Sequence, residues 1–203
     1  MIKVAEKICE LWEKTEVCQV TSPLGTDVSF RLKGRPGTVV DGMATEPGEL
    51  DYFPNAAVSI APVEETINGT IVIDGCISPG GLVSAPITCR LEKGVITAIE
   101  GGADATAWCS HLESAGDPKA FHVCHFDVGL NPRARMSDNM HQSEQVMGAV
   151  TFGFGNQDPS YKGTVGAAKV HFDAVLLSPT VYLDGVVMRE NNKWNPDLGL
   201  GGL

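Results

Sequence analysis

Residues 87–99 read ITCRLEKGVITAI, and this stretch decides the class of the fold. Two short β-rich runs, Ile87–Leu91 and Val95–Ile99, flank the pair Lys93-Gly94. A glycine in a two-residue connection favours a tight hairpin turn, because glycine adopts positive φ without a steric penalty. The stretch therefore predicts two strands joined by a tight turn.

The same pattern of β-rich runs and turn residues recurs in both directions from this hairpin. We expect further strands at Glu16–Val20, Val28–Leu32, Val58–Ile60, Thr70–Ile73, Phe121–Val128, Val150–Phe154, Ala168–Leu177, Thr180–Leu183 and Val186–Arg189. Asp184-Gly185, between the last two of these strands, predicts a second tight turn.

Helices are expected at few places. Apolar side chains recur at helical spacing over residues 2–14, with Glu and Lys on the opposite face. A second helix is expected over Ala103–Ser114, and a short helical turn at Gln142–Met147. Residues 34–56, rich in Gly, Pro and acidic residues, predict a long loop. Together these elements predict an α+β fold, a single β-dominated domain over residues 1–203 with a mixed or antiparallel sheet.

The net charge and the cysteine spacing argue against several classes of partner and site. A net charge of −10 at pH 7 argues against nucleic acid and anionic membranes as partners, since both bind basic surfaces. No apolar run approaches the roughly 18 residues of a membrane span, and the N-terminus lacks a signal peptide's apolar stretch. We therefore expect a cytoplasmic protein. The six cysteines include no Cys-x-x-Cys pair, which argues against a zinc ribbon.

Side chains that bind metal ions are concentrated in three segments. These are residues 121–127 (FHVCHFD), 139–144 (NMHQSE) and 169–175 (KVHFDAV). Histidine and carboxylate together suit iron, zinc or manganese. The three segments therefore predict one site for a divalent metal, provided that the fold brings them together.

Strand geometry assigns these side chains to faces. In a strand, residues i and i+2 point to the same side, so His171 and Asp173 project together. In the same way, Val123, His125 and Asp127 are expected on one face, and His122, Cys124 and Phe126 on the other.

His125, His171 and Asp173 form the candidate ligand set, with Glu144 as a further ligand or a base. Two histidines and one carboxylate leave coordination positions open, as in non-haem iron(II) oxygenases. Simpler interpretations stay open at this point: His171 and Asp173 can be a hydrogen-bonded strand pair, and Glu144 a solvated charge. Asp127 precedes a glycine turn and is expected to accept backbone hydrogen bonds. His122 and His141 are expected to be surface or hydrogen-bonded histidines.

An ordered series of short motifs resembles a known superfamily. The motifs are Ser22–Asp27, Ala61–Glu64, Asn68–Thr70, Gly129–Pro132, Gln142–Gly148, His171-x-Asp173 and Pro179–Gly185. Their order and spacing resemble the C-terminal half of aminopeptidase T-type metallo-aminopeptidases and of 2,5-dihydroxypyridine 5,6-dioxygenase, an iron(II) enzyme. The resemblance implies that residues 1–203 form the C-terminal metal-binding domain, without the N-terminal α/β domain usual in the superfamily.

The resemblance also implies roles for individual residues. The aminopeptidase branch has a metal-binding glutamate six residues before the Asn of the Gly-x-Asn-Pro turn; here that position is His125, which resembles the iron ligand of the dioxygenase branch. Asp173 matches a ligand of both branches, and Glu144 matches a second metal-binding glutamate of the aminopeptidases. Thr151 falls near the position where the aminopeptidase branch often has a histidine. Because this chain lacks both that histidine and the glutamate replaced by His125, the resemblance argues against a two-zinc peptidase site. Tyr52 is a candidate acid/base or substrate-binding group, or an interface aromatic.

The sequence and the resemblance are therefore compatible with three functions. The first is an iron(II) ring-opening dioxygenase for a small hydroxylated aromatic or N-heterocycle, with zinc or manganese as alternative metals. The second is a metal-dependent aminopeptidase or amide hydrolase, in which Glu144 acts as base. The third is a non-catalytic assembly subunit that partners a separately encoded N-terminal domain. The resemblance makes a homo-oligomer the default expectation.

Overall fold

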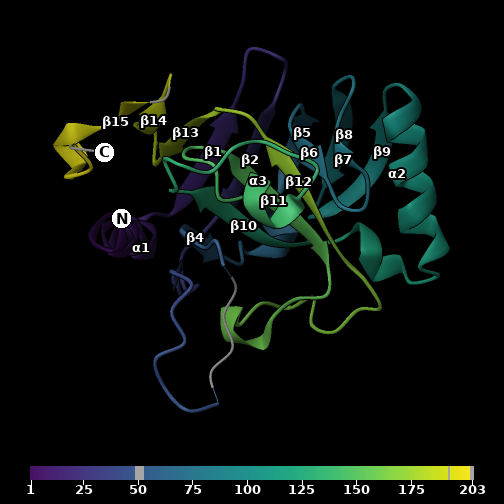
Figure 1. The fold of residues 1–203 in the computed structure, drawn as a ribbon. Helices are drawn as coiled ribbons and strands as arrows, with labels where there is room; N and C mark the ends of the chain where they lie inside the picture. Colours follow the sequence, from purple (N-terminus) through teal and green to yellow (C-terminus); the bar gives the residue numbers. More distant parts are fainter. Residues whose placement is uncertain (49–52, 192, 202–203) are drawn as a thin grey trace.

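Two antiparallel β-sheets make up most of the fold (Figure 1). The computed structural model describes residues 1–48, 53–191 and 193–201, so the candidate residue Tyr52 lies outside the described residues. The predicted α+β, β-dominated class is confirmed, and the paired strands are antiparallel throughout the described ladders.

Within the described residues, one sheet has eight strands in the order β15-β14-β13-β1-β2-β5-β8-β9. Its strands are β1 (Val17–Thr21), β2 (Asp27–Arg31), β5 (Asn68–Ile73), β8 (Ile87–Glu92), β9 (Val95–Glu100), β13 (Thr180–Leu183), β14 (Val186–Glu190) and β15 (Lys193–Trp194). The hairpin predicted at Lys93-Gly94 is present, because β8 pairs with β9 and both turn residues have positive φ, 49° and 77°.

The other sheet has seven strands in the described chain, in the order β3-β4-β10-β11-β12-β6-β7. These are β3 (Thr38–Val40), β4 (Ala57–Ile60), β6 (Cys76–Ile77), β7 (Gly81–Leu82), β10 (Val123–Gly129), β11 (Val150–Gly155) and β12 (His171–Leu176). The prediction of a structureless loop over 34–56 was wrong at β3, which pairs with β4. All three metal-competent segments lie on or beside this sheet.

Helices lie at the ends of the sheets. In Figure 1, α1 (Ile2–Lys14) and α2 (Ala103–Ser114) are on opposite sides of the molecule, and both have the predicted bounds. The third helix, α3 (Met140–Ser143), begins two residues and ends four residues earlier than the turn predicted at Gln142–Met147. Short 3-10 turns are η1 (Glu64–Thr66), η2 (Pro118–Phe121), η3 (Pro159–Tyr161) and η4 (Pro196–Leu198). No described helix has both the length and the apolar character to cross a membrane.

Aromatic side chains fill the space between the two sheets. Phe30 of β2 packs against Phe126 of β10, with ring centroids 5.0 Å apart, and against Phe152 of β11 at 6.1 Å. All three side chains are at most 1% exposed. Because strand side chains alternate, the neighbours of Phe126 and Phe152 in sequence point to the outer face of the seven-stranded sheet. The candidate ligands stand on this outer face.

One predicted face assignment was wrong. The pairing of β10 with β11 shifts register between Val123 and His125, which marks a β-bulge. The extra residue reverses the alternation, so Val123 is buried in the core while His125 faces the outer side. Cys124, expected opposite His125, instead lies beside it, in a group of potential ligands with His171.

Candidate metal centre

Two of the candidate ligands, His125 and Asp173, stand in one row across strands β10, β11 and β12. His125 of β10 pairs with Gly153 of β11, and Gly153 pairs with Asp173 of β12. The imidazole lies over the glycine: a Cβ at position 153 would be 2.0 Å from His125 Nε2. Gly153 therefore leaves the space through which His125 reaches Asp173. His171, two residues before Asp173, stands in the next row on the same face.

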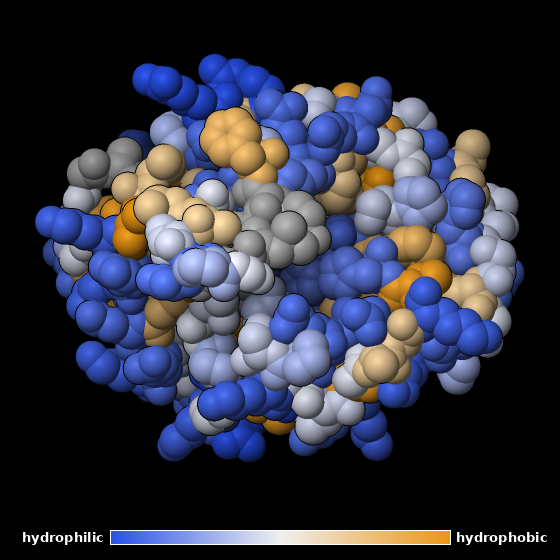
Figure 2. Space-filling view, turned by 60° about the horizontal axis from the view of Figure 1, so that its bottom comes forward, coloured by the Kyte–Doolittle hydropathy of each residue, from blue (hydrophilic) through white to orange (hydrophobic). Residues whose placement is uncertain are grey.

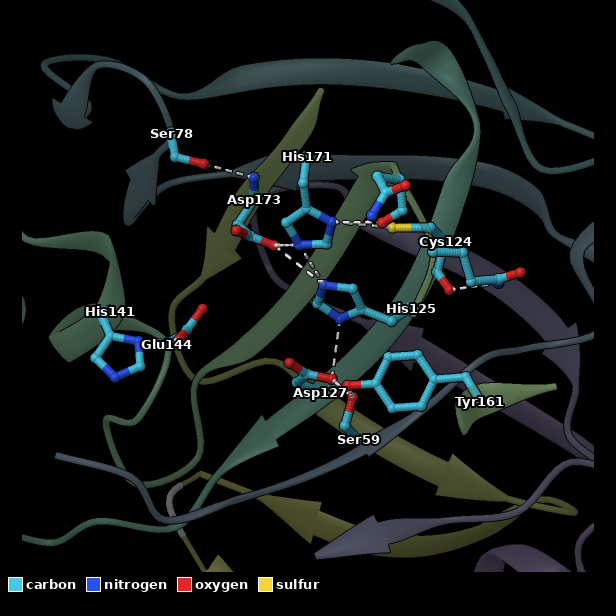
Figure 3. Close-up of polar contacts among 12 residues, drawn as sticks. Ser59, Ser78, Cys124, His125, Asp127, His141, Glu144, Tyr161, His171 and Asp173 are labelled. Atoms are coloured by element: carbon cyan, nitrogen blue, oxygen red, sulfur yellow. Dashed lines mark hydrogen bonds and ion pairs between the residues drawn. The ribbon is translucent and has the colours of Figure 1, made fainter. Parts of the chain in front are cut away.

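Three donor atoms converge to a near-equilateral triangle (Figure 3). The distances are 3.2 Å from His125 Nε2 to His171 Nε2, 3.1 Å from His125 Nε2 to Asp173 Oδ1, and 3.3 Å from His171 Nε2 to Asp173 Oδ1. The two rings are nearly parallel, with an interplanar angle of 9°. Segments 121–127 and 169–175 thus meet, as the prediction of one site required.

The other nitrogen of each imidazole already has an acceptor. His171 Nδ1 donates to the backbone carbonyl of Asn156 at 2.7 Å, and His125 Nδ1 lies 3.0 Å from Asp127 Oδ1. An acceptor at Nδ1 places the proton there and leaves the Nε2 lone pair free. In the neutral state, both Nε2 lone pairs then point at one another and at a carboxylate, which is repulsive unless a cation or proton lies among them.

The triangle has the dimensions of a metal site. With bonds of about 2.1 Å, neighbouring donors are about 3.0 Å apart around an octahedral ion and about 3.4 Å apart around a tetrahedral ion. The three observed distances, 3.1–3.3 Å, lie between these values. Both Nδ1 positions also have the acceptor partners that metal-bound histidines usually have. The residues present therefore fit a divalent transition metal.

The local charges favour a cation at this point. Burial lowers the pKa of His171, but its contacts with Asp173 and Cys124 outweigh burial and raise the pKa to about 11. Burial also lowers the pKa of His125, and the carboxylates of Asp127 and Asp173 outweigh it and hold the pKa well above its usual value. Burial raises the pKa of Asp173, whereas hydrogen bonding to both imidazoles outweighs it and lowers the pKa. The field that holds protons here would equally hold a metal ion in their place.

Cys124 lies next to this triangle. Its thiol is 3.8 Å from His171 Nδ1, and Cys124, His125 and His171 form a group able to hold a metal ion. His171 Nδ1, however, already donates to Asn156 at 2.7 Å. The Nε2 triangle is the better-supported set, because it leaves that hydrogen bond intact.

The triangle opens into a polar cavity of about 420 Å³. Figure 2, turned so that the bottom of Figure 1 comes forward, shows a hollow with mainly hydrophilic walls on this side. The lining residues are Val40, Asn55, Ala57, His125, Asp127, His141, Glu144, Gln145, Asn156, Asp158, Tyr161, His171 and Asp173. This described lining has four carboxylates and neither lysine nor arginine, so a bound cation would offset its negative charge. The volume is that of a small-molecule site.

Glu144 lies on the cavity wall rather than in the triangle. Its Oε1 is 3.1 Å from His141 Nδ1 and accepts from Gln145 Nε2 at 3.2 Å. Burial, reinforced by the charges of Asp173 and Asp127, raises the pKa of Glu144. His141, expected at the surface or in a hydrogen bond, is hydrogen-bonded and lines the same cavity (Figure 3).

A buried carboxylate outside the cavity anchors the connection between β11 and β12. Glu64 Oε1 accepts from Gln157 Nε2 at 2.8 Å and from the Thr164 amide at 2.7 Å, and Glu64 Oε2 lies 2.5 Å from Arg35 Nη2. Gln157 also donates to the Cys124 carbonyl at 2.7 Å. The anchored segment supplies Asn156, Asp158 and Tyr161 to the cavity.

Several residues of the centre were not predicted. Asp127 was expected to accept backbone hydrogen bonds, but its carboxylate instead accepts from the side chains of His125 and Ser59. Gly153 could have been found from the sequence. Glycines at 153 and 155 alternate with phenylalanines, and this pattern indicates that another group approaches the strand closely on the glycine face. No sequence pattern points to Ser59 or Tyr161, since each acts through a contact with residues far away in sequence.

The sequence is similar to that of a known family of dioxygenases. Residues 2–194 match the sequence model of the 2,5-dihydroxypyridine 5,6-dioxygenase family. The curated 2,5-dihydroxypyridine 5,6-dioxygenase of Pseudomonas putida is 30% identical over 185 residues, which cover 86% of this chain and 53% of that protein. This chain therefore spans about half the length of the relative.

Solved structures agree on the fold. The 2,5-dihydroxypyridine dioxygenase structure from Pseudomonas putida superposes with a TM-score of 0.83 at 25% identity, covering 96% of this chain and 59% of that one. Wild-type AmpT from Thermus thermophilus superposes with a TM-score of 0.72 at 20% identity, covering 93% and 52%. The resemblance to this superfamily is thus confirmed, and the chain belongs to the 2,5-dihydroxypyridine 5,6-dioxygenase family.

Proposed function

We propose that this chain carries the metal centre of an iron(II) ring-opening dioxygenase acting on a small hydroxylated aromatic or N-heterocycle similar to 2,5-dihydroxypyridine. The observation that carries the proposal is the triangle of His125 Nε2, His171 Nε2 and Asp173 Oδ1, with sides of 3.1–3.3 Å. Family membership supports iron and dioxygen over the other chemistries of such a triad, with zinc or manganese as alternative metals.

The three side chains would hold the metal and leave its other positions to substrate and oxygen. When bound, the metal would supply Lewis acidity and the electron transfer that activates dioxygen. His171 is the most exposed of the three, with 40% of its side chain accessible against 7% for His125 and 12% for Asp173. A substrate would therefore reach the centre from the cavity on the His171 side.

The proposed reaction balances without another reductant. Both atoms of dioxygen enter the product, one ring carbon–carbon bond breaks, and the substrate itself supplies the four electrons that reduce dioxygen. The cavity fits one ring of this size, since its volume is about 420 Å³. No cofactor besides the metal is required.

Glu144 is the proposed base of this centre. Its carboxylate lies on the cavity wall, and burial brings its pKa upward from the usual glutamate value, toward neutral pH. Glu144 would accept the proton of a substrate hydroxyl in the cavity and so leave the substrate as an anion. His141, at 3.1 Å, would stabilise the carboxylate in its ionised state. Tyr52 remains a second proposed acid/base group.

We further propose that assembly completes the cavity. The walls of the cavity would then be shared with another copy of this chain, in a homo-oligomer, or with a separately encoded N-terminal-domain subunit. In either case the metal ligands would come from His125, His171 and Asp173.

Oxygen uptake tests the proposed activity. Protein reconstituted with Fe(II) without air is mixed with 2,5-dihydroxypyridine and air-saturated buffer. One mole of oxygen consumed per mole of substrate is expected. The matched controls are Asp173→Ala, which should abolish uptake, and Asp197→Ala in η4, which should not change it. Peptide hydrolysis without oxygen uptake would instead identify an amide hydrolase, and failure to bind any metal would identify a non-catalytic subunit.

A further inference from the structure

A chain of hydrogen bonds leads from the cavity wall to the back of His125 (Figure 3). The Ser59 hydroxyl is 2.8 Å from the Tyr161 hydroxyl and also contacts Asp127 Oδ1, which in turn lies 3.0 Å from His125 Nδ1. Ser59 and Asp127 are register partners on β4 and β10. Tyr161 comes from η3, in the connection between β11 and β12.

The direction of these bonds follows from the number of protons. A serine has one hydroxyl proton, and an ionised carboxylate only accepts. Ser59 therefore donates to Asp127, and its oxygen accepts from the Tyr161 hydroxyl. His125 Nδ1–H donates to the same carboxylate oxygen. Each proton in the chain then has one acceptor, and the bonds to the charged Asp127 are the stronger ones.

We propose that Ser59 and Tyr161 are positioning residues for the metal centre, which fix the Asp127 carboxylate and through it the ring of His125. Without the Ser59 hydroxyl, the carboxylate could rotate away from Nδ1, and the ring would lose the bond that directs Nε2 into the triangle. The Tyr161 ring also restricts the movement of the His125 ring by direct contact, since the two ring centroids are 6.0 Å apart. The metal part of this inference rests on the proposed function.

The same connection also orients the second histidine. Asn156, five residues before Tyr161, accepts from His171 Nδ1 at 2.7 Å. Residues 156–161 thus reach the rear nitrogen of both imidazoles, directly at His171 and through Ser59 and Asp127 at His125. Outer partners of this kind typically change metal affinity about 10- to 100-fold when they are removed.

Two variants remove single hydroxyls without changing the packing. Tyr161→Phe keeps the ring contact with His125 and removes only the phenol hydroxyl, and Ser59→Ala removes the bridge itself. The matched controls are Tyr182→Phe on β13 and Ser29→Ala on β2, both on the other sheet. The first readout is the imidazole ¹⁵N resonances of the metal-free protein, which report the hydrogen bond at Nδ1. The second is the Fe(II) dissociation constant, measured by competition with a chelator in the absence of air.

In metal-free protein, we expect Ser59→Ala and Tyr161→Phe to shift the His125 resonances, with those of His111 and His122 unchanged. The Fe(II) dissociation constant should rise about tenfold in Ser59→Ala and less in Tyr161→Phe. The double variant should match Ser59→Ala alone, because the Tyr161 hydroxyl acts only through Ser59 and phenylalanine keeps the ring contact. His125 resonances that move no more than in the control variants would overturn the inference. If the resonances move but the wild type binds no metal, the proposed function fails while the positioning of the His125 ring stands.

Discussion

Replacing Gly153 with alanine tests the metal centre without substituting any of the proposed ligands. The added Cβ would lie 2.0 Å from His125 Nε2 and 2.1 Å from its Cδ2, where ordinary contact begins at 3.4 Å. The ring must therefore move by roughly 1.4 Å, from 2.0 to 3.4 Å, which is far beyond the tolerance of about 0.2 Å in a metal–ligand distance. Gly153 is in a strand and is not among the positive-φ glycines, so alanine fits its backbone.

The expected loss of Fe(II) affinity is at least about 100-fold, equivalent to about 2.7 kcal/mol. The free energy of unfolding of the metal-free Gly153→Ala variant should lie within about 1 kcal/mol of the wild-type value. The His125 ring can swing into the cavity, and alanine is more favourable than glycine in a strand. Isothermal titration with Fe(II) under nitrogen measures the affinity, and urea unfolding measures the stability.

Gly102→Ala is the matched control for this experiment. A Cβ added at Gly102 would have nothing within 4 Å, so alanine there should leave Fe(II) affinity unchanged. If Gly153→Ala bound Fe(II) as tightly as Gly102→Ala, the ring of His125 would not be part of the metal centre, and the reasoning from the triangle would be refuted.

Asp173→Ala should remove stoichiometric Fe(II), measured by elemental analysis, because the triangle loses its only carboxylate; full occupancy would exclude Asp173 as a ligand. Glu144→Gln should retain Fe(II) but lower the rate of oxygen uptake about 100-fold or more, as expected for a base; loss of iron would instead make Glu144 a ligand. Burial raises the pKa of Glu64, and its hydrogen bonds with Gln157 and Thr164 outweigh burial and lower the pKa below 4.5. Its stabilising effect is therefore complete above pH 4.5 and is lost as the pH falls through the lowered pKa. Glu64→Gln leaves the partly buried Arg35 guanidinium without its charge partner and should lower the free energy of unfolding by about 3 kcal/mol at pH 7. Urea unfolding at pH 3 should show a smaller difference; an equal difference at both pH values would contradict the assignment.

Local sequence patterns were sufficient to predict the main helices and hairpins. The helix over residues 2–14 and the hairpin at Lys93-Gly94 depend on neighbours in sequence, and both are present in the structure. The pairing of His171 with Asp173 on one face also follows from strand geometry alone. Such features are fixed by side chains within a few residues, so a single sequence contains them.

The rest of the centre depends on contacts that a single sequence does not contain. The bulge before His125 reversed the expected faces of Val123 and Cys124, because one extra residue shifts the alternation and no glycine marks its position. Ser59 and Tyr161 are 102 residues apart and meet only once the connection after β11 folds back over the sheet. Their hydroxyls look like ordinary surface groups until that topology is known.

The most direct test of the central claim is anomalous diffraction at the iron edge from crystals grown with Fe(II) in the absence of air. We predict one peak about 2.1 Å from each of His125 Nε2, His171 Nε2 and Asp173 Oδ1. Iron bound elsewhere, or no peak within bonding distance of these three atoms, would contradict the account.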